Sequence, residues 1–275
     1  MYILFDIGSS KTRVSLTDKK TEEGFLDPVI FDTPQSLEEV AEQISLSVEN
    51  FGVSGKVEGA FGGVSGVRDE THSIVHYSVN RPSWSGQPVK DILEKKLGVE
   101  VNLENDADLV GLGEAVSGAG INHSVVVYIT VSTGVGGVRI VDGRIDSAIY
   151  GFEPGFQIID SRKPHEYEST LEGKISGTAF ERKFGCKAYQ VTNNAHWEQA
   201  SLDCAIGLYN SILHWSPELV VLGGSMIVGT PGIPVDLIAK NFHELGSHLP
   251  NIPEIRKAEL GSIGGIYGAL AISNF

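Results

Sequence analysis

The chain has 275 residues, enough for one large or two medium domains, and 41% of them are hydrophobic, which excludes a disordered polypeptide. Its 35 acidic and 21 basic residues leave a net charge of −14, which disfavours binding to nucleic acid or to an anionic membrane surface. Two cysteines cannot form a disulfide framework or a multi-cysteine zinc site, and no apolar run approaches a membrane helix, so we expect a cytoplasmic protein.

The first part of the chain alternates between strands and helices, as in an α/β domain. Ser36 has the spacing of a capping box, which predicts that a helix begins directly after it. Gly98 is placed to end another helix. The predicted elements are strands at 2–5, 13–17, 57–64 and 99–103, with helices from Ser36, at 89–97 and at 106–119.

The opening strand–turn–strand unit recurs near the middle of the chain. Strands are predicted at 124–130 and 138–141, followed by a hairpin turn at Asp142-Gly143. One such unit in each half is the plan of the actin-like ATPase fold, although strand–turn–strand units also recur by chance in α/β proteins. The elements predicted to follow are helices at 171–184, 195–213, 235–245 and 263–272, and a strand at 217–222.

Glycine-bearing turns follow three of the apolar strands. A turn of this kind directs backbone N–H groups to one point and lets a phosphate approach closely. The sequence has no GxxxxGK[ST] motif, which excludes a P-loop NTPase, and no GxGxxG after the first strand, which disfavours a nicotinamide-binding domain. The three turns are Asp6–Lys11, Thr133–Gly137 and Leu222–Ser225.

Two carboxylates lie at positions suited to phosphate chemistry. Asp6 is next to the first turn, where it either holds Mg²⁺ against a polyphosphate or caps its own turn. Asp106 lies between the 99–103 strand and a helix, where it is either an N-cap or a general base. If Asp106 is a general base, Asn105 would bind the same substrate.

At these residues the sequence resembles the ROK family (repressors, open reading frames, kinases) of sugar kinases. Residues 5–13, FDIGSSKTR, are similar to the family motif DIGGTKIR, and residues 103–108, LENDAD, are similar to VENDAN. Further motifs of the family are resembled, in the same order along the chain, by the segments 60–66, 80–84, 128–137 and 221–225. The resemblance implies an actin-like ATPase (ribonuclease H-like) fold of two α/β domains with a cleft between them. It implies a smaller domain at 1–104 plus 262–275 and a larger one at 105–261.

The resemblance also implies an activity and a site. The activity is transfer of the γ-phosphoryl group of ATP to a hydroxyl of a hexose or N-acetylhexosamine, glucokinase-like as a first expectation, with Asp106 as the general base. The implied sugar-binding residues are Gly66, Asn80, Asn105, Asp106, Glu153 and Glu172. The implied nucleotide-binding residues are Asp6, Gly8, Ser9, Ser10, Lys11, Thr133, Gly134, Gly136, Gly223 and Gly224. Asp6 would hold Mg²⁺ through water.

The sequence departs from the family pattern at the position of a zinc ligand. Phe156 stands where the family has a histidine, and the cysteine cluster is absent, so we expect no structural zinc and leave the identity of the sugar open. One alternative is a catalytically weak sugar-binding or regulatory protein of the ROK type without a DNA-binding domain, since the first strand begins at residue 2. Another is a different actin-like ATPase or an acyl-phosphate kinase. Polyphosphate as donor and a homodimer also remain open.

Overall fold

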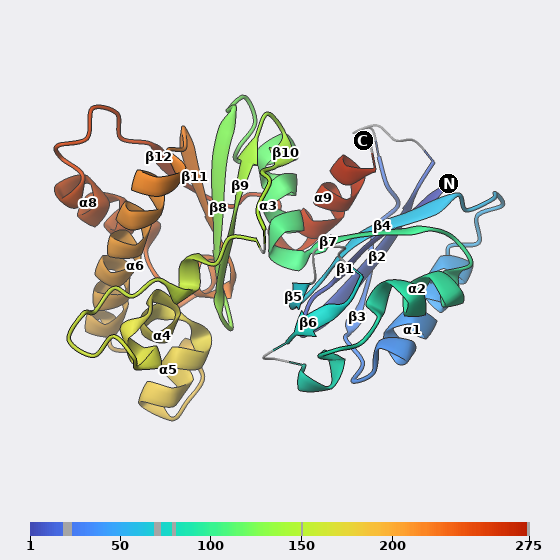
Figure 1. Cartoon of the computed structure of the whole chain (residues 1–275), viewed down its shortest axis with the longest axis horizontal. Coiled ribbons are helices and arrows are strands. Elements are labelled where there is room, and N and C mark those ends of the chain that lie inside the picture. The colour runs from blue at the N-terminus through green and yellow to red at the C-terminus, as the bar shows by residue number, and fades with distance from the viewer. Residues whose placement is uncertain (19–23, 69–72, 79–80, 150, 274–275) are drawn as a thin grey trace. The chain divides into compact units, whose positions relative to one another are not determined.

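The computed structural model describes residues 1–18, 24–68, 73–78, 81–149 and 151–273, which form two compact α/β units (Figure 1). Unit 1 comprises Met1–Ser117, Ala148–Tyr150 and Leu260–Phe275, and unit 2 comprises Gly118–Ser147 and Gly151–Glu259. The predicted domain boundaries, 1–104 plus 262–275 and 105–261, stay a prediction. Among the described residues, no helix has both the length and the apolar character that crossing a membrane requires.

Unit 1 is built on a five-stranded sheet of order β3-β2-β1-β4-β7, in which β1, β4 and β7 are parallel and β2 and β3 antiparallel. Its strands are β1 (Tyr2–Ile7), β2 (Lys11–Thr17), β3 (Val29–Asp32), β4 (Gly59–Val64) and β7 (Val101–Asn105), with β5 (Val67–Arg68) and β6 (Val75–Tyr77) as a separate pair. Its helices are α1 (Leu37–Asn50), α2 (Val89–Leu97), α3 (Asp106–Ser117) and α9 (Gly264–Ile272), with the 3₁₀ turns η1 (Pro82–Trp84) and η5 (Gly261–Ile263).

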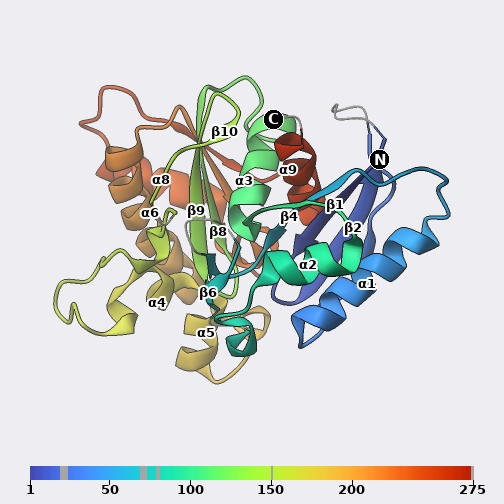
Figure 2. The same ribbon diagram turned by 45° about the vertical axis from the view of Figure 1, so that its right-hand side comes forward.

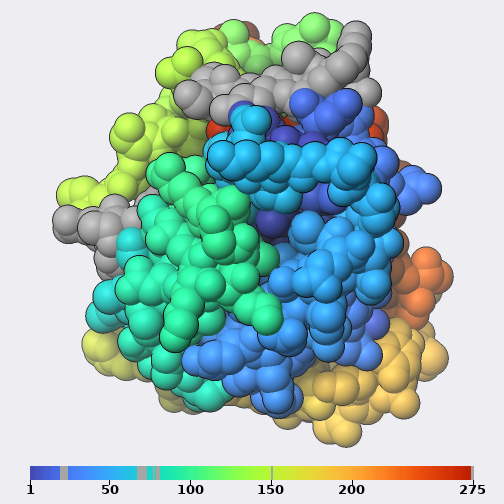
Figure 3. Space-filling model, turned by 90° about the vertical axis from the view of Figure 1, so that its right-hand side faces the viewer, coloured from blue at the N-terminus to red at the C-terminus, as the bar shows by residue number. Residues whose placement is uncertain are grey.

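Helices cover both faces of this sheet. α1 and α2 lie side by side on one face, and α3 and α9 lie on the other (Figures 1 and 2). Figure 3 looks onto the side chains of α1 and α2. Side chains alternate along β1, so Ile3 and Phe5 join the core under α1 and α2 while Leu4 packs with α3 and α9. Asp6 is two residues after Leu4 in the strand, so its side chain lies on the same face of the sheet, the one covered by α3 and α9.

Glycines allow α3 and α9 to approach one another closely. A Cβ on Gly268 of α9 would lie 1.8 Å from the carbonyl oxygen of Leu109 in α3. A Cβ on Gly113 of α3 would lie 2.3 Å from the carbonyl oxygen of Gly264. Both distances are far below van der Waals contact, so only glycine permits this helix pair.

Unit 2 repeats the plan with a sheet of order β10-β9-β8-β11-β12. α6 and α8 pack together, and Trp197, Leu208 and Phe242 belong to the same buried core as the sheet residues. The strands are β8 (Val125–Val131), β9 (Val135–Val141), β10 (Arg144–Ile145), β11 (Leu219–Gly223) and β12 (Glu254–Lys257). The helices are α4 (Leu171–Ile175), α5 (Gly177–Phe184), α6 (Asn194–Trp215), α7 (Ser225–Val228) and α8 (Val235–Leu245), with the 3₁₀ turns η2 (Pro154–Phe156), η3 (Tyr167–Ser169) and η4 (Ala188–Gln190).

The predicted elements are present, with one correction. The single helix expected at 171–184 is wrong, because the chain forms two helices separated at Ser176, whose backbone is extended. The Ser176 hydroxyl accepts from the Ala179 N–H and so caps a new helix rather than continuing the old one. The Ser36 cap is confirmed by its bond from the Glu39 N–H at 3.2 Å. The edge strands β3 and β12 were not predicted.

Candidate functional site

The predicted site residues fall into two groups, one in each unit. The group in unit 1 consists of Asp6, Gly8, Ser9, Ser10, Lys11, Gly66, Asn105 and Asp106. The group in unit 2 consists of Thr133, Gly134, Gly136, Glu153, Glu172, Gly223 and Gly224. Asn80 lies outside the described residues.

Asp6 is a buried carboxylate with one cationic partner. The β1–β2 register places it opposite Arg13, whose Nη1 donates to Asp6 Oδ2 at 3.1 Å. Burial raises the pKa of Asp6 to about 7; Arg13 acts against this rise, and the charge of Asp106 adds to it. A Cβ on Gly265 of α9 would lie 2.6 Å from the Asp6 carboxyl carbon, so a glycine is needed for α9 to pack here.

The first glycine turn is held from one side by Thr33, which directly follows β3. The Thr33 hydroxyl donates to the Gly8 carbonyl at 2.8 Å, and the Thr33 N–H donates to the Ser10 carbonyl at 3.1 Å. The Gly8 N–H donates to the Lys11 carbonyl at 3.1 Å and closes the turn. Lys11 itself forms an exposed ion pair with Asp32 at 2.7 Å, so its ammonium group lies at the sheet surface.

Asn105, rather than Asp106, caps α3. Its Oδ1 accepts from the Ala107 N–H at 2.8 Å, and its Nδ2 donates to the Gly66 carbonyl at 3.1 Å. The N-cap interpretation of Asp106 is therefore wrong: Asp106 is the first residue of the helix, with Oδ1 3.0 Å from the same Ala107 nitrogen. The Asn105 bond also joins the Gly66 loop to the start of α3, so three predicted sugar-site residues lie together.

Glu172 holds the second glycine turn. Its Oε2 accepts from the Val135 N–H at 2.8 Å, and its Oε1 accepts from the Tyr167 hydroxyl at 3.2 Å. A Cβ on Gly134 would lie 2.6 Å from Oε2, which explains the need for glycine at that position. A residue predicted for the sugar and a turn predicted for phosphate are thus in direct contact.

The second and third glycine turns are neighbours. The Thr133 carbonyl accepts from the Thr178 hydroxyl at 2.7 Å, which fixes the second turn to the start of α5. Gly224 has a φ of 87°, and a Cβ there would lie 2.3 Å from the Val131 carbonyl oxygen. Ser132 and Ser225 complete the contact through their hydroxyls at 3.2 Å. The two predicted nucleotide turns of unit 2 therefore form one surface.

Glu153 lies on the segment that packs against β9 through Gly155, where a Cβ would lie 2.3 Å from the Val135 carbonyl oxygen. Desolvation and the charge of Glu172 raise the pKa of Glu153 to about 7, although the residue is exposed to solvent, which weakens this effect. The fold thus disfavours the ionised form of this side chain near neutral pH.

Replacing Glu153 by Gln is expected to change stability in a pH-dependent way. The pKa of Glu153 is higher in the folded protein than in the unfolded chain. The contribution of Glu153 to the wild-type free energy of unfolding is therefore kept at low pH and lost as pH rises through about 7. Glu153→Gln should therefore match the wild type at pH 4.5 and exceed it by about 1 kcal/mol at pH 8, a figure reduced for solvent screening. Urea denaturation at both pH values measures this. Glu198→Gln, at an exposed position of α6, is the control; a gain for Glu153→Gln that is equal at both pH values would contradict the expectation.

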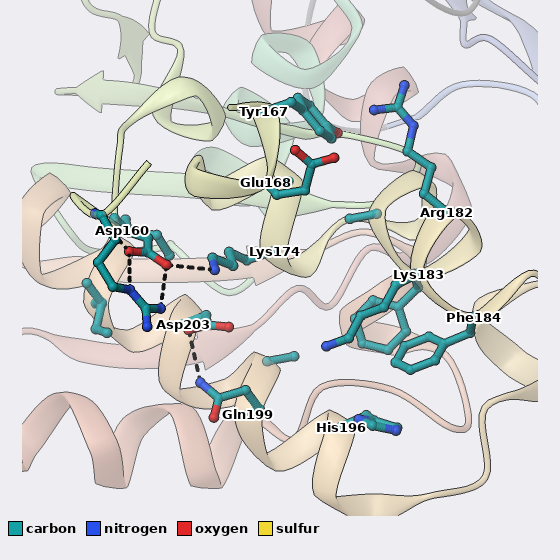
Figure 4. Close-up of a pocket in the computed structure, with 17 residues that line it drawn as sticks. Asp160, Tyr167, Glu168, Lys174, Arg182, Lys183, Phe184, His196, Gln199 and Asp203 are labelled. Atoms are coloured by element: carbon teal, nitrogen blue, oxygen red, sulfur yellow. Dashed lines mark hydrogen bonds and ion pairs between the residues drawn. The ribbon is translucent and has the colours of Figure 1, made fainter. Parts of the chain in front are cut away.

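A cavity of about 760 Å³ lies elsewhere in unit 2, between the 159–168 segment, α4, α5 and α6 (Figure 4). Asp160 accepts from Arg162 at 2.7 Å and from Lys174 at 3.2 Å, and Gln199 donates to Asp203 at 3.1 Å. None of the predicted site residues lines this cavity. The ion pair between Asp160 and Lys174 fixes the 159–168 segment to α4.

Sequence reasoning missed four residues that support the site: Arg13, Thr33, Arg81 and Tyr167. The Arg13 signal was available, because a short turn between two strands pairs residues 6 and 13 across the hairpin. Thr33 and Arg81 bind the first turn across 25 and 72 residues of sequence, which no local pattern reports. Tyr167 acts on the second turn only through its bond to Glu172. Within the described part of the chain, no cluster of three or more His, Cys, Asp or Glu residues could hold a metal ion.

Comparisons with known proteins agree with this arrangement. The model of the ROK family matches residues 2–274. An N-acetyl-D-glucosamine kinase of Yersinia pseudotuberculosis is 28% identical over 310 aligned positions that cover 98% of this chain and 97% of the relative. The crystal structure of a ROK hexokinase from Thermus thermophilus has a TM-score of 0.80 and 26% identity, with 98% and 97% of the two chains covered.

A second solved structure extends the likeness in fold. It is a ROK family glucokinase from Streptomyces griseus in complex with glucose and AMPPNP, with a TM-score of 0.79, 23% identity and 98% of each chain covered. The predicted fold class, an actin-like ATPase fold with two α/β domains, is confirmed by these likenesses.

Proposed function

Because the chain belongs to the ROK family, we propose that it is an ATP-dependent sugar kinase acting on a hydroxyl of a hexose or N-acetylhexosamine. The observation that carries the proposal is the start of α3, where Asn105 caps the helix and ties it to Gly66. This leaves Asp106 in the first turn as the candidate general base. In phosphoryl transfer the protein mainly positions groups and stabilises charge, so a carboxylate of ordinary basicity suffices to accept the hydroxyl proton.

The proposed roles of the remaining residues follow from the contacts of each unit. The first turn, Gly8–Lys11, and the joined turns around Gly134 and Gly224 are proposed to bind the nucleotide, the first turn through the N–H groups of Ser9 and Ser10. Gly66, Asn105, Glu153 and Glu172 are proposed to bind sugar hydroxyls, since carboxylates and amides accept and donate strong hydrogen bonds there. A cytoplasmic location is part of the proposal, and light scattering tests whether the protein is a monomer or a homodimer.

A coupled ADP-release assay over hexoses and N-acetylhexosamines tests the proposed function. A kinase gives sugar-dependent ADP release with at least one member of the panel. A sugar-binding or regulatory protein instead binds a sugar by calorimetry without turnover, and an acyl-phosphate kinase responds to a carboxylate but to no sugar. Parallel reactions with polyphosphate identify the phosphoryl donor.

We propose that Asp6 would hold a Mg²⁺ ion through water, next to the nucleotide phosphates. Mg²⁺ prefers carboxylate, phosphate and water oxygens, and a divalent cation beside Asp6 would offset the desolvation that raises its pKa. When bound, Mg²⁺ supplies charge neutralisation of the polyphosphate.

Removing divalent metal is expected to abolish turnover without unfolding the protein. EDTA should stop ADP release, added Mg²⁺ should restore it, and the melting temperature should stay constant because we propose no structural zinc site. Elemental analysis provides the control. Stoichiometric zinc in the purified protein, or a melting temperature that falls sharply with EDTA, would contradict the proposal.

A further inference from the structure

Arg81 reaches across unit 1 to the first glycine turn. Its Nε and Nη2 both donate to the Ser9 carbonyl, at 2.9 and 2.6 Å. Its Nη2 also donates to the Thr33 carbonyl at 2.8 Å, and its Nη1 donates to the Pro34 carbonyl at 3.0 Å. One guanidinium therefore joins the turn to the segment between β3 and α1.

These bonds determine which way the peptides of the turn face. In a planar trans peptide, the C=O of one residue and the N–H of the next point in opposite directions. Fixing the Ser9 carbonyl toward Arg81 therefore turns the Ser10 N–H away from it, and Thr33 does the same for the Ser9 N–H through the Gly8 carbonyl. Among the described residues, neither N–H donates to the backbone of the chain, and Ser10 is exposed, so the two N–H groups are the candidate donors to an anion.

Arg81 is itself held in place. Its N–H donates to the buried Ser78 hydroxyl at 3.2 Å, and the next turn of chain is anchored by Trp84, whose Nε1 donates to the Gln35 carbonyl at 2.9 Å. Trp84 is almost wholly buried, and the Arg81 guanidinium lies 5.5 Å from its ring centre. The side chain is thus fixed at both ends, as a positioning group requires.

We propose that Arg81 is a positioning residue that presets the Gly8–Ser10 turn to bind the nucleotide phosphates, an inference that rests on the proposed function. A guanidinium has five N–H donors, and the four bonds to carbonyl oxygens use four of them. Arg81 therefore acts through the backbone of the turn and not as a direct phosphate ligand.

Lysine cannot reproduce this arrangement, because an ammonium group is a single point of charge without the planar fork of donors. Arg81→Lys keeps the charge of the site while it loses most of the bonds. The Ser9–Ser10 peptide can then rotate, and the N–H groups must be reoriented each time a nucleotide binds. Arg81→Lys is therefore expected to lower the affinity for the nucleotide.

The test compares Arg81→Lys with Arg162→Lys, an equal change at an exposed arginine of unit 2 that pairs with Asp160. KM for ATP, KM for the sugar and kcat are measured by ADP release, and Kd for AMPPNP by calorimetry. Arg81→Lys should raise both KM for ATP and Kd for AMPPNP about 10-fold or more, with a much smaller change in KM for the sugar. Arg162→Lys should leave all four values within twofold of wild type.

A purely structural role predicts a lower melting temperature with an unchanged Kd for AMPPNP, and that result in folded Arg81→Lys overturns the proposal. If Arg81→Lys fails to fold, Thr33→Val decides instead. Thr33→Val should raise the Kd for AMPPNP, whereas Thr33→Ser should keep the wild-type Kd, and an unchanged Kd in Thr33→Val overturns the proposal.

If the wild type phosphorylates no sugar, the proposed function fails, and the AMPPNP comparison still decides the role of Arg81. If the wild type binds no AMPPNP, both fail.

Discussion

Replacing Asp106 by Asn is expected to lower kcat by about 10²-fold or more while the protein stays folded. Asparagine cannot accept the proton of the sugar hydroxyl at neutral pH, although it keeps the size of the side chain and an oxygen for the Ala107 N–H. Because Asn105 is the cap of α3, the substitution leaves the start of the helix intact. The loss should therefore appear in kcat, with little change in the Kd for the sugar.

Asp108→Asn is the matched control for this experiment. It makes the same chemical change in the first turn of the same helix, outside the proposed site, and we expect kcat to stay within a few fold of wild type. Circular dichroism and sugar binding by calorimetry establish that both variants are folded. Turnover close to wild type in folded Asp106→Asn would remove the assignment of Asp106 as the general base.

The largest effect on stability is expected from Gly268→Ala. The added methyl group would lie 1.8 Å from the Leu109 carbonyl oxygen, and neither atom can move without separating α9 from α3. The separation breaks the packing of Leu109 with Ile266 and Ala269, so the free energy of unfolding should fall by about 3 kcal/mol or more. Hydrogen exchange of amides in α3 and α9 measures the loss within unit 1.

Gly59→Ala is the control for this substitution. Gly59 is buried in β4, but a Cβ there would meet its nearest atoms at 3.7 Å, which is ordinary van der Waals contact. The amide hydrogen-exchange rates of Gly59→Ala should differ from those of the wild type far less than the rates of Gly268→Ala do. Equal effects of the two substitutions would show that the close approach of α3 and α9 is not what makes glycine necessary.

The parts of the fold that were predicted correctly are those coded by short stretches of sequence. The three glycine turns follow their strands because an apolar run and a glycine lie next to one another in the chain. Ser36 was found as a cap because capping depends on residues three apart. Ser176 carries a similar signal, but the apolar periodicity on both sides of it predicted a continuous helix.

The errors in the site have a different physical origin. Asp106 and Asn105 are both good N-caps in isolation, and the choice between them is made by the Gly66 carbonyl, which is 39 residues distant in sequence and binds Asn105. In the same way, Arg81 contacts Ser9 across 72 residues. Such pairs depend on how strands are ordered in the sheet, and that order cannot be read from local patterns in one sequence.

The position of α9 in the chain has a consequence for how the protein is made. α9 covers the Leu4 and Asp6 face of the first sheet, yet it follows α3 by roughly 150 residues, which the ribosome adds in about 7–30 s. Throughout that interval Leu4 and Leu109 lack the cover of α9, and exposed apolar surface of this kind favours aggregation of a folding intermediate. The α3–α9 face around Asp6 is therefore completed only after the whole of the second unit has emerged, so the first sheet cannot reach its final packing in a partly synthesised chain.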